Sequence, residues 1–395
     1  MSKYRLQTII FVLTSFMLGC NEFIVVGVIS DISKSLNVSV ATVGYLVTIF
    51  ATVFAVSTPF ITVLTNRFSR YKTLMVLVLI FLAGNTLSGF ATSYALLLVM
   101  RVVTASVAGA IESFIIAFAN DIAPHDKRAV LIAWISAGFS IASVIGVPIG
   151  VAISTADSWH TAFHVISGIT LVTALLLAWL LPRNVAQVKG GVKDQLVFLT
   201  DKRVYLGIAV NLFMAATMYA YYTYIRPLIT TSMGFNLTSL NWLLFALGIM
   251  SIISNRLSGA LAERHGLPKL PWFYVADMLL LIALPVALNS RVVGFGILLI
   301  LTLIVTIAGA PIQIHFLDVA AESYPQATML ASSVSAISFN IGISVGSATA
   351  SLMLSQVGLQ NISFGAAGYA LVSLILVVAL NRVIASHRQS VVLEK

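Results

Sequence analysis

The stretch Gln7–Ile29 reads QTIIFVLTSFMLGCNEFIVVGVI, and Glu22 is the one charged residue in it. Its 23 residues are enough for a helix to cross the roughly 30 Å hydrocarbon core of a membrane. A charge inside such a helix costs at least about 2.5 kcal/mol on insertion scales, so it usually faces a polar interior or a partner. The stretch therefore predicts a membrane-spanning helix with Glu22 as a titratable functional group. The alternatives are a carboxyl that completes a hydrogen bond between helices or one that reaches toward the membrane surface.

The whole chain is strongly apolar. Of its 395 residues 59% are hydrophobic and 9% are charged, and the mean hydropathy is +1.02. Soluble domains carry about 25% charged residues, so the composition predicts a protein that crosses the bilayer many times. The net charge of +9 does not indicate nucleic-acid binding, because the basic residues recur in short loops throughout the chain. The single cysteine, Cys20, excludes an internal disulfide framework and a cysteine-based metal site.

Apolar windows of about 20 residues predict an all-α protein with twelve membrane-spanning helices. The first six are expected at 7–29, 41–63, 73–93, 96–118, 129–153 and 161–181. A polar segment at 183–203 separates them from six more, at 204–224, 241–260, 270–288, 293–316, 329–354 and 364–385.

Lysine and arginine are unevenly distributed between the two sides of this map. With the N-terminus inside, the inner segments hold 18 of the 22 basic residues, and the outer ones hold only Lys34, Arg226 and Arg291. Cytoplasmic loops carry such an excess. The bias therefore predicts that both termini and the segment 183–203 are cytoplasmic.

Two sequence patterns recur at about half the chain length. GALAERHG at 259–266 has the frame of TVLTNRFS at 62–69, at an offset of 197 residues. Gly342 and Gly346 repeat Gly146 and Gly150 at an offset of 196. These matches predict an N-terminal half at 1–182, a linker at 183–203 and a C-terminal half at 204–395. Each half has an even number of spans, so the two are parallel repeats, and the substrate is expected between them near mid-membrane.

These residues resemble the major facilitator superfamily of transporters over essentially the whole chain. The segment Gly259–Gly266 is similar to the loop 2–3 motif of that family, with Glu263 in place of its Asp. Thr62, Asn66 and Ser69 depart from it in the first copy.

Further motifs resemble the drug:proton antiporter branch, especially its sugar, drug and purine efflux permeases. They are Asn21-Glu22-Phe23, Arg101 in the fourth span, Gly138 with Gly146-Val-Pro148-Ile-Gly150, Trp159 with Phe163, and Tyr224-Ile225 with Pro227.

Glu22 and Arg101 are the expected proton-coupling residues. Glu22 is roughly 10 Å from the outer side by the rise per residue, and Arg101 begins the polar face of the fourth span. The two are therefore expected at a similar depth. Arginine keeps its proton in proteins, so competition between Arg101 and a proton for Glu22 would couple transport to protons. A fixed buried ion pair is the alternative.

The expected substrate cavity is lined by polar and aromatic residues on one face of several spans. Glu112 lies on the side of the helix that carries Arg101, because eleven residues turn the direction by only 20° more than three full turns. The other expected cavity residues are Asn211, Met218 and Tyr222 in the seventh span, and Asn340 and Ser344 in the eleventh. Contacts that only hold helices together are an equal alternative.

A third group of residues is expected to serve conformational change. Glycine and proline in the fifth span allow close helix contact and a bend, and the charged loop ends are expected to form a latch. These residues are Arg67, Arg70, Asp121, Gly146, Pro148, Gly150, Gly259, Glu263, Arg264 and Gly266.

The resemblance implies a proton-coupled efflux transporter, an antiporter for small amphipathic molecules or drugs, in a bacterial cytoplasmic membrane. The expected partners are a small-molecule substrate, protons and the bilayer, with no nucleic acid, no cofactor and no metal, and we expect a monomer. Sodium stays open as the coupling ion. The alternative within transport is a metabolite exporter for sugars or purine nucleosides. A membrane sensor or an intramembrane enzyme is the alternative from another class. No nucleotide-binding or hydrolase motif occurs in the chain, so we expect no enzyme.

Overall fold

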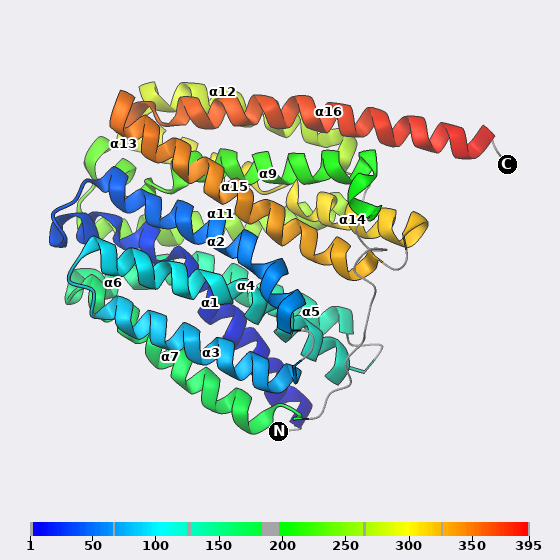
Figure 1. Cartoon of the computed structure of the whole chain (residues 1–395). Coiled ribbons are helices and arrows are strands. Elements are labelled where there is room, and N and C mark those ends of the chain that lie inside the picture. Colours follow the sequence, from blue (N-terminus) through cyan, green and yellow to red (C-terminus); the bar gives the residue numbers. More distant parts are fainter. Residues whose placement is uncertain are drawn as a thin grey trace. The chain divides into compact units, whose positions relative to one another are not determined.

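The computed structural model describes residues 3–65, 68–124, 128–183, 197–263, 266–324 and 327–393. Within these ranges the secondary structure is helical, with no strand (Figure 1). Twelve helical segments among the described residues are long and apolar enough to cross a membrane. The predicted fold class is therefore confirmed: the chain is an all-α, multi-pass membrane protein.

The chain divides into two compact units. Unit 1 comprises 1–188 with 236–248, and unit 2 comprises 189–235 with 249–395. The predicted linker at 183–203 falls largely outside the described residues, so its boundaries stay a prediction. Its last two residues, Lys202 and Arg203, already belong to a helix.

Unit 1 contains the first six spans. They are α1 (Lys3–Ser35), α2 (Val40–Thr65), α3 (Arg70–Gly89), α4 (Tyr94–Ile122), α5 (Arg128–Ile141) with a π-helical turn (Ala142–Gly146) and α6 (Val147–Ala156), and α7 (Trp159–Leu180). The fifth span is thus two α-helices joined by a π-helical turn. Pro148 follows this turn directly, and a proline cannot donate to the preceding turn.

Unit 2 contains the remaining six spans apart from the start of α11. The helices that form these spans and their connections are α9 (Lys202–Tyr222), α10 (Ile225–Pro227), α11 (Leu237–Glu263), α12 (Leu270–Ala287), α13 (Arg291–Val305), α14 (Gly309–Ser323), α15 (Thr328–Val357) and α16 (Ser363–Leu393). The predicted span at 293–316 lies within one membrane-length segment, Arg291–Ser323, whose helix is interrupted by a short turn between α13 and α14.

Side chains at the helix starts satisfy backbone donors that have no partner within the helix. Ser93 accepts a hydrogen bond from the Leu96 N–H before α4, and Asp201 accepts one from the Arg203 N–H before α9. The polar residues between the apolar runs therefore fix where these helices begin.

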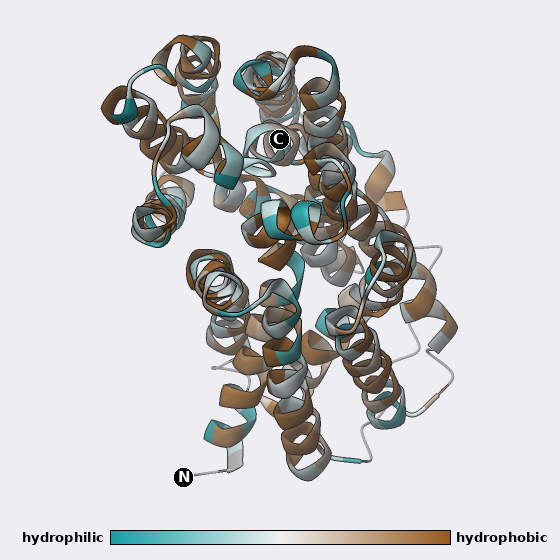
Figure 2. Ribbon diagram, turned by 90° about the vertical axis from the view of Figure 1, so that its left-hand side faces the viewer, coloured by the Kyte–Doolittle hydropathy of each residue, from teal (hydrophilic) through white to brown (hydrophobic). Residues whose placement is uncertain are grey.

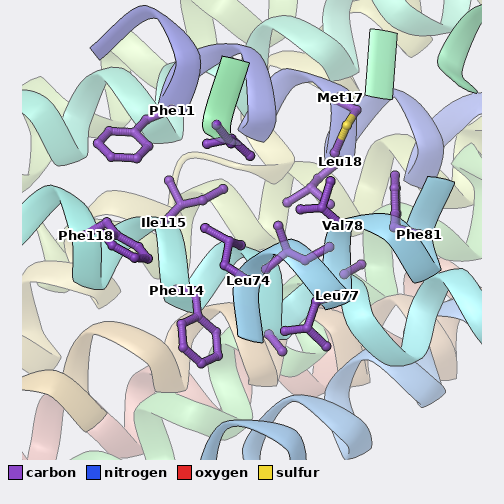
Figure 3. Packing of buried hydrophobic residues seen from close by; sticks show 14 of the residues in the cluster. Phe11, Met17, Leu18, Leu74, Leu77, Val78, Phe81, Phe114, Ile115 and Phe118 are labelled. Atoms are coloured by element: carbon purple, nitrogen blue, oxygen red, sulfur yellow. The ribbon is translucent and has the colours of Figure 1, made fainter. Parts of the chain in front are cut away.

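Apolar side chains form the interior of unit 1, where α1, α3 and α4 meet. Figure 3 shows Phe11 and Leu18 of α1 together with Leu77 of α3 and Phe114 and Ile115 of α4, all of which belong to one buried cluster. Unit 2 has a corresponding cluster that includes Phe198, Met214 and Phe316.

The outward faces are apolar as well. Trp242, Trp272 and Val292 are 74%, 77% and 82% exposed, and hydrophobic colour runs along most helices in Figure 2. Exposed apolar surface on this scale is unusual in a soluble protein and is typical of helices that face lipid.

The same helix pairings occur in both units. In unit 1, α1 packs against α5 and α7, and α3 packs against α7. In unit 2, α9 packs against α15 and α16, and α12 packs against α16. The first helix of each unit therefore packs against the fifth and sixth spans of its own unit.

Candidate functional site

Polar side chains in the middle of unit 1 surround one buried arginine. Arg101 of α4 is 0% exposed. Its Nη1 donates to the backbone oxygen of Asn21 at 2.8 Å and to the Asn21 Oδ1 at 3.2 Å. Its Nη2 lies 3.5 Å from the backbone oxygen of Glu22. These contacts join α4 to the middle of α1.

Two further side chains complete this arrangement, which we call the Arg101 cluster (Asn21, Phe50, Asn85 and Arg101). The guanidinium carbon of Arg101 lies 4.1 Å from the centre of the Phe50 ring of α2, a geometry in which a cation is attracted to the ring face. Asn21 also donates to the Oδ1 of Asn85 in α3. All four helices of this part of unit 1 therefore contribute to the cluster.

Glu22 lies at the edge of the Arg101 cluster and is 6% exposed. Among the described residues no side chain pairs with its carboxylate, and Arg101 binds the Glu22 backbone oxygen instead. The two residues do meet at the same depth, as the sequence indicates, but the contact is not an ion pair. The residue next to Glu22 in sequence, Asn21, takes the position opposite the guanidinium.

Glu112 of α4 is half-buried, and among the described residues no hydrogen-bond partner holds its carboxylate. It lies near enough to Glu22 for the two charges to interact. Unit 1 thus brings together Glu22, Glu112 and Arg101, three of the residues that the sequence singles out. Such a group of intramembrane charges is typical of ion or substrate pathways.

The expected cavity residues of the seventh and eleventh spans have mixed surroundings. The Asn211 amide of α9 donates to the backbone oxygen of Ser335 at 2.8 Å and to the Ser338 Oγ at 2.7 Å, so it ties α9 to α15. Met218, Tyr222 and Ser344 are half-buried, and the Tyr222 ring lies edge-on to Tyr219 at 5.9 Å.

Asn340 of α15 is 5% exposed. Its amide nitrogen donates to Ala336 O at 3.2 Å, but its Oδ1 has no partner in the described part of the chain. A role of this residue and of Met218, Tyr222 and Ser344 in substrate binding stays a prediction.

The glycines of the fifth span lie against α1. A Cβ added at Gly146 would lie 3.1 Å from the Cys20 sulfur, and one added at Gly150 would collide with Ile24. Gly342 and Gly346 of α15 approach the backbone of α9 in the same manner. The repeated glycines therefore have one shared structural effect, close contact with the first helix of their unit.

The residues expected to form a latch are only partly described. Arg67 and Arg264 lie outside the described residues, and Asp121 lies in the last turn of α4, where only its backbone is described. Arg70 begins α3, and Glu263 ends α11 with its side chain exposed. Gly259 has open space around its Cα, whereas a side chain at Gly266 would collide with Leu261.

A charged network at the start of α9 was not expected from the sequence. Arg203 pairs with Asp201 and with Glu322 of α14, both at 2.9 Å. Burial raises the pKa of Asp201, but the hydrogen bonds and charge of Arg203 outweigh this effect and hold that pKa below its usual value. The acidic residue before an apolar run is the sequence signal for the helix start, but nothing in the sequence links it to Glu322.

Asn85 is the other residue of the site that sequence reasoning missed. A single amide within an apolar span is a recognisable signal, because polar side chains inside membranes usually contact other helices. Among the described residues no group of three or more His, Cys, Asp or Glu side chains is placed to hold a metal ion.

Comparisons with known proteins identify the family. A family model described as the Major Facilitator Superfamily matches residues 11–338. Two proteins of Bacillus subtilis (strain 168), the uncharacterized MFS-type transporters YtbD and YbcL, are 29% and 27% identical. The matches cover 88% and 91% of this chain and 88% and 92% of theirs.

Solved structures share the fold at low sequence identity. A bacterial homologue of the human lysosomal transporter Spinster, inward-facing and unoccupied, has a TM-score of 0.77 at 15% identity and covers 96% of this chain and 95% of its own. A D-xylose-proton symporter has a TM-score of 0.77 at 12% identity and covers 95% of this chain and 97% of its own.

Proposed function

Because the chain belongs to the major facilitator superfamily of membrane transporters, we propose that it exports small amphipathic molecules in exchange for protons. Glu22 is the group that takes up and releases the proton. The protein works in a bacterial cytoplasmic membrane with both termini inside, as the distribution of basic residues favours.

The observation that carries this proposal is the state of the Glu22 carboxylate. It lies inside a membrane-spanning helix, is almost fully buried, and has no ion-pair partner among the described residues. Ionising such a group is expensive because it loses its hydration without gaining hydrogen bonds. A nearby proton or cation therefore changes the energy of the Glu22 carboxylate more than it changes the energy of a carboxylate in an ion pair.

Arg101 and Glu112 oppose each other in their effect on Glu22. The fixed positive charge of Arg101 stabilises an ionised Glu22, and a negative charge on Glu112 disfavours it. Arg101 is bound to the backbone of α1 through Asn21 and Glu22, so a small movement of α1 relative to α4 changes this balance. A cationic substrate near Glu22 and Glu112 would displace the proton, which couples export to proton entry.

Proton coupling occurs in this fold, because one of the structural neighbours is named a D-xylose-proton symporter. That name also supports the substrate class of the second candidate, in which the chain exports neutral metabolites such as sugars or purine nucleosides. The half-buried Tyr222 and the unpartnered Oδ1 of Asn340 suit a flat or hydroxylated neutral molecule. Both candidates use the same proton site.

The test is a transport assay in vesicles that contain a pH-sensitive dye, with cationic drugs, nucleosides and sugars offered under an imposed proton gradient. Glu22→Gln is compared with Asp318→Asn, which removes an exposed carboxylate of α14. We expect substrate-dependent proton flux in the wild type and in Asp318→Asn, and its loss in Glu22→Gln with substrate binding retained.

Three outcomes would contradict parts of the proposal. Undiminished proton flux in Glu22→Gln would assign coupling to another group, with Glu112 the next to replace. Substrate flux that follows a sodium gradient and ignores the proton gradient would exclude protons as the coupling ion. Net uptake of substrate together with protons would replace antiport by symport.

A further inference from the structure

Asp277 is a second intramembrane carboxyl, and it belongs to unit 2. It lies within α12, in the membrane-spanning segment Leu267–Ala287. The residue is 1% exposed, and among the described residues neither carboxylate oxygen has a hydrogen-bond partner. It is thus more deeply buried than Glu22.

Hydroxyl-bearing side chains lie in the neighbourhood of this carboxyl, but among the described residues none is within hydrogen-bond distance of it. Tyr274 precedes it by three residues on the same side of α12, is 3% exposed, and has a hydroxyl that also lacks a partner. Tyr221 of α9 lies near enough to interact with the charge of Asp277, and its hydroxyl lies beside Thr302 of α13. We call these four residues the Asp277 pocket.

No cation lies in or beside the Asp277 pocket among the described residues. The helices packed against α12 are α13 and α16. Arg291 begins α13 and donates to Met233 O at 3.0 Å. In α16 the Tyr369 hydroxyl pairs with Thr349, and Arg382 and His387 lie near its C-terminal end.

An ionised Asp277 has nothing in this pocket to replace its hydration. Burying an unpaired ion is so costly that such a group usually takes the neutral form. As a neutral acid, Asp277 gains an O–H donor and keeps a carbonyl acceptor. The neutral acid thereby avoids the cost of a buried charge that no hydrogen bond stabilises, which the ionised form cannot avoid among the described residues.

We propose that the Asp277 pocket is a proton-binding site of unit 2, in which Asp277 holds a proton at neutral pH because no described side chain pairs with its ionised form. The only bond made on binding is the O–H bond between the proton and a carboxylate oxygen. This site involves none of the residues of the Arg101 cluster, and it does not rest on the proposed export function. The protein then carries one protonatable carboxyl site in each unit.

Infrared spectroscopy of the protein in lipid vesicles tests this proposal directly, because a protonated carboxyl has a carbonyl stretching band distinct from that of a carboxylate. We expect Asp277→Asn to lose one protonated-carboxyl band at neutral pH and to lose no carboxylate intensity. The matched control, Glu22→Gln in unit 1, keeps that band. Loss of carboxylate intensity in Asp277→Asn would show that the residue is ionised, for example through an ordered water, and would overturn the proposal.

A second measurement has a readout other than spectroscopy, the pH dependence of stability. In thermal unfolding, the wild type is expected to lose stability as the pH rises through neutral, since the unfolded chain releases a proton that the folded protein holds. Asp277→Asn should reduce this slope, and an unchanged slope would contradict proton binding.

Discussion

The two units use the same close contact between their first and fifth spans, at equivalent glycines. In unit 1, Gly146 lies against Cys20 of α1, and in unit 2 Gly342 lies against the backbone of Leu212 in α9. The fifth span of unit 1 is interrupted by a π-helical turn, whereas α15 is one continuous helix of 30 residues. The contact is shared, but only unit 1 builds an irregular turn into it.

The polar groups of the units differ more than their packing. The middle of unit 1 holds a buried arginine and two carboxyls, whereas in unit 2 the first helix is joined to the fifth span by the neutral Asn211 and Ser338. The charged network of unit 2 is instead at the start of α9, around Arg203. The start of α1 has a neutral contact with a different span, between Gln7 and Leu180 O of α7 at 2.9 Å. The two units therefore share their helix packing but differ in the polar residues that join the helices.

The largest effect on stability is expected for Arg101→Met. The change leaves the Asn21 backbone oxygen and Oδ1 without their donor, at about 1–3 kcal/mol for each buried acceptor. We expect a loss of about 3 kcal/mol or more in unfolding experiments in detergent, and a smaller loss for Arg101→Lys. The control is Arg256→Met, at an exposed position of α11, which should stay within about 0.5 kcal/mol. If the loss of stability in Arg101→Met were no larger than that in Arg256→Met, the Arg101 cluster would not stabilise unit 1.

Alanine at the equivalent glycines is expected to distinguish the two contacts. In Gly342→Ala the new methyl group meets a backbone oxygen, which must move with its helix, so we expect a loss of about 2 kcal/mol. In Gly146→Ala it meets the Cys20 sulfur at 3.1 Å, and we expect less than about 1 kcal/mol. Gly368→Ala, which has open space around it, is the control for helix propensity. Similar losses in Gly342→Ala and Gly146→Ala would mean that the contacts tolerate bulk equally.

The fold could be predicted because apolar windows of membrane length leave few alternatives. The span at 293–316 was predicted, but the turn that interrupts its helix was not, because this turn contains Ile307 and Ala308, which are as apolar as the helices. A hydropathy window does not detect the interruption of a helix when the residues of the intervening turn are apolar.

The site could be predicted only in part. A lone charge in an apolar span marks Glu22 and Arg101 as interior residues. Which residue faces Arg101 depends on the rotation of α1 about its axis, and successive residues on a helix differ by about 100°. The structure turns Asn21 toward Arg101 and leaves the Glu22 carboxylate beside it. Sequence spacing within one helix carries no information on this rotation.

The amides of the two units offer a smaller test of the same contrast. Asn211→Ala removes a neutral bond between α9 and α15, and such bonds contribute about 1 kcal/mol in membranes. Asn21→Ala should cost more, because Asn21 binds both Arg101 and Asn85. Thermal unfolding of both variants in one detergent gives the comparison. An Asn211→Ala loss as large as that of Asn21→Ala would show that the charge of Arg101 adds nothing to the contact in unit 1.

The smallest expected effect is the acid response of the network around Arg203. The pKa of Asp201 is lowered in the folded protein, so its contribution to stability is complete above the unfolded value of about 3.9 and is lost as the pH falls through the folded value. The unfolding temperature of the wild type is therefore expected to decrease below about pH 4. Asp201→Asn can keep the bond from the Arg203 N–H that begins α9, but it has no carboxylate to titrate.

The acid part of the curve should consequently be flatter in Asp201→Asn and unchanged in Asp318→Asn, whose carboxylate is exposed. If Asp201→Asn has the acid response of the wild type, the charges at the start of α9 do not stabilise unit 2. The neutral contact of Gln7 at the start of α1 would then stabilise its unit as well as the charged network stabilises unit 2. The charges that distinguish the two units in stability would be only those around Arg101.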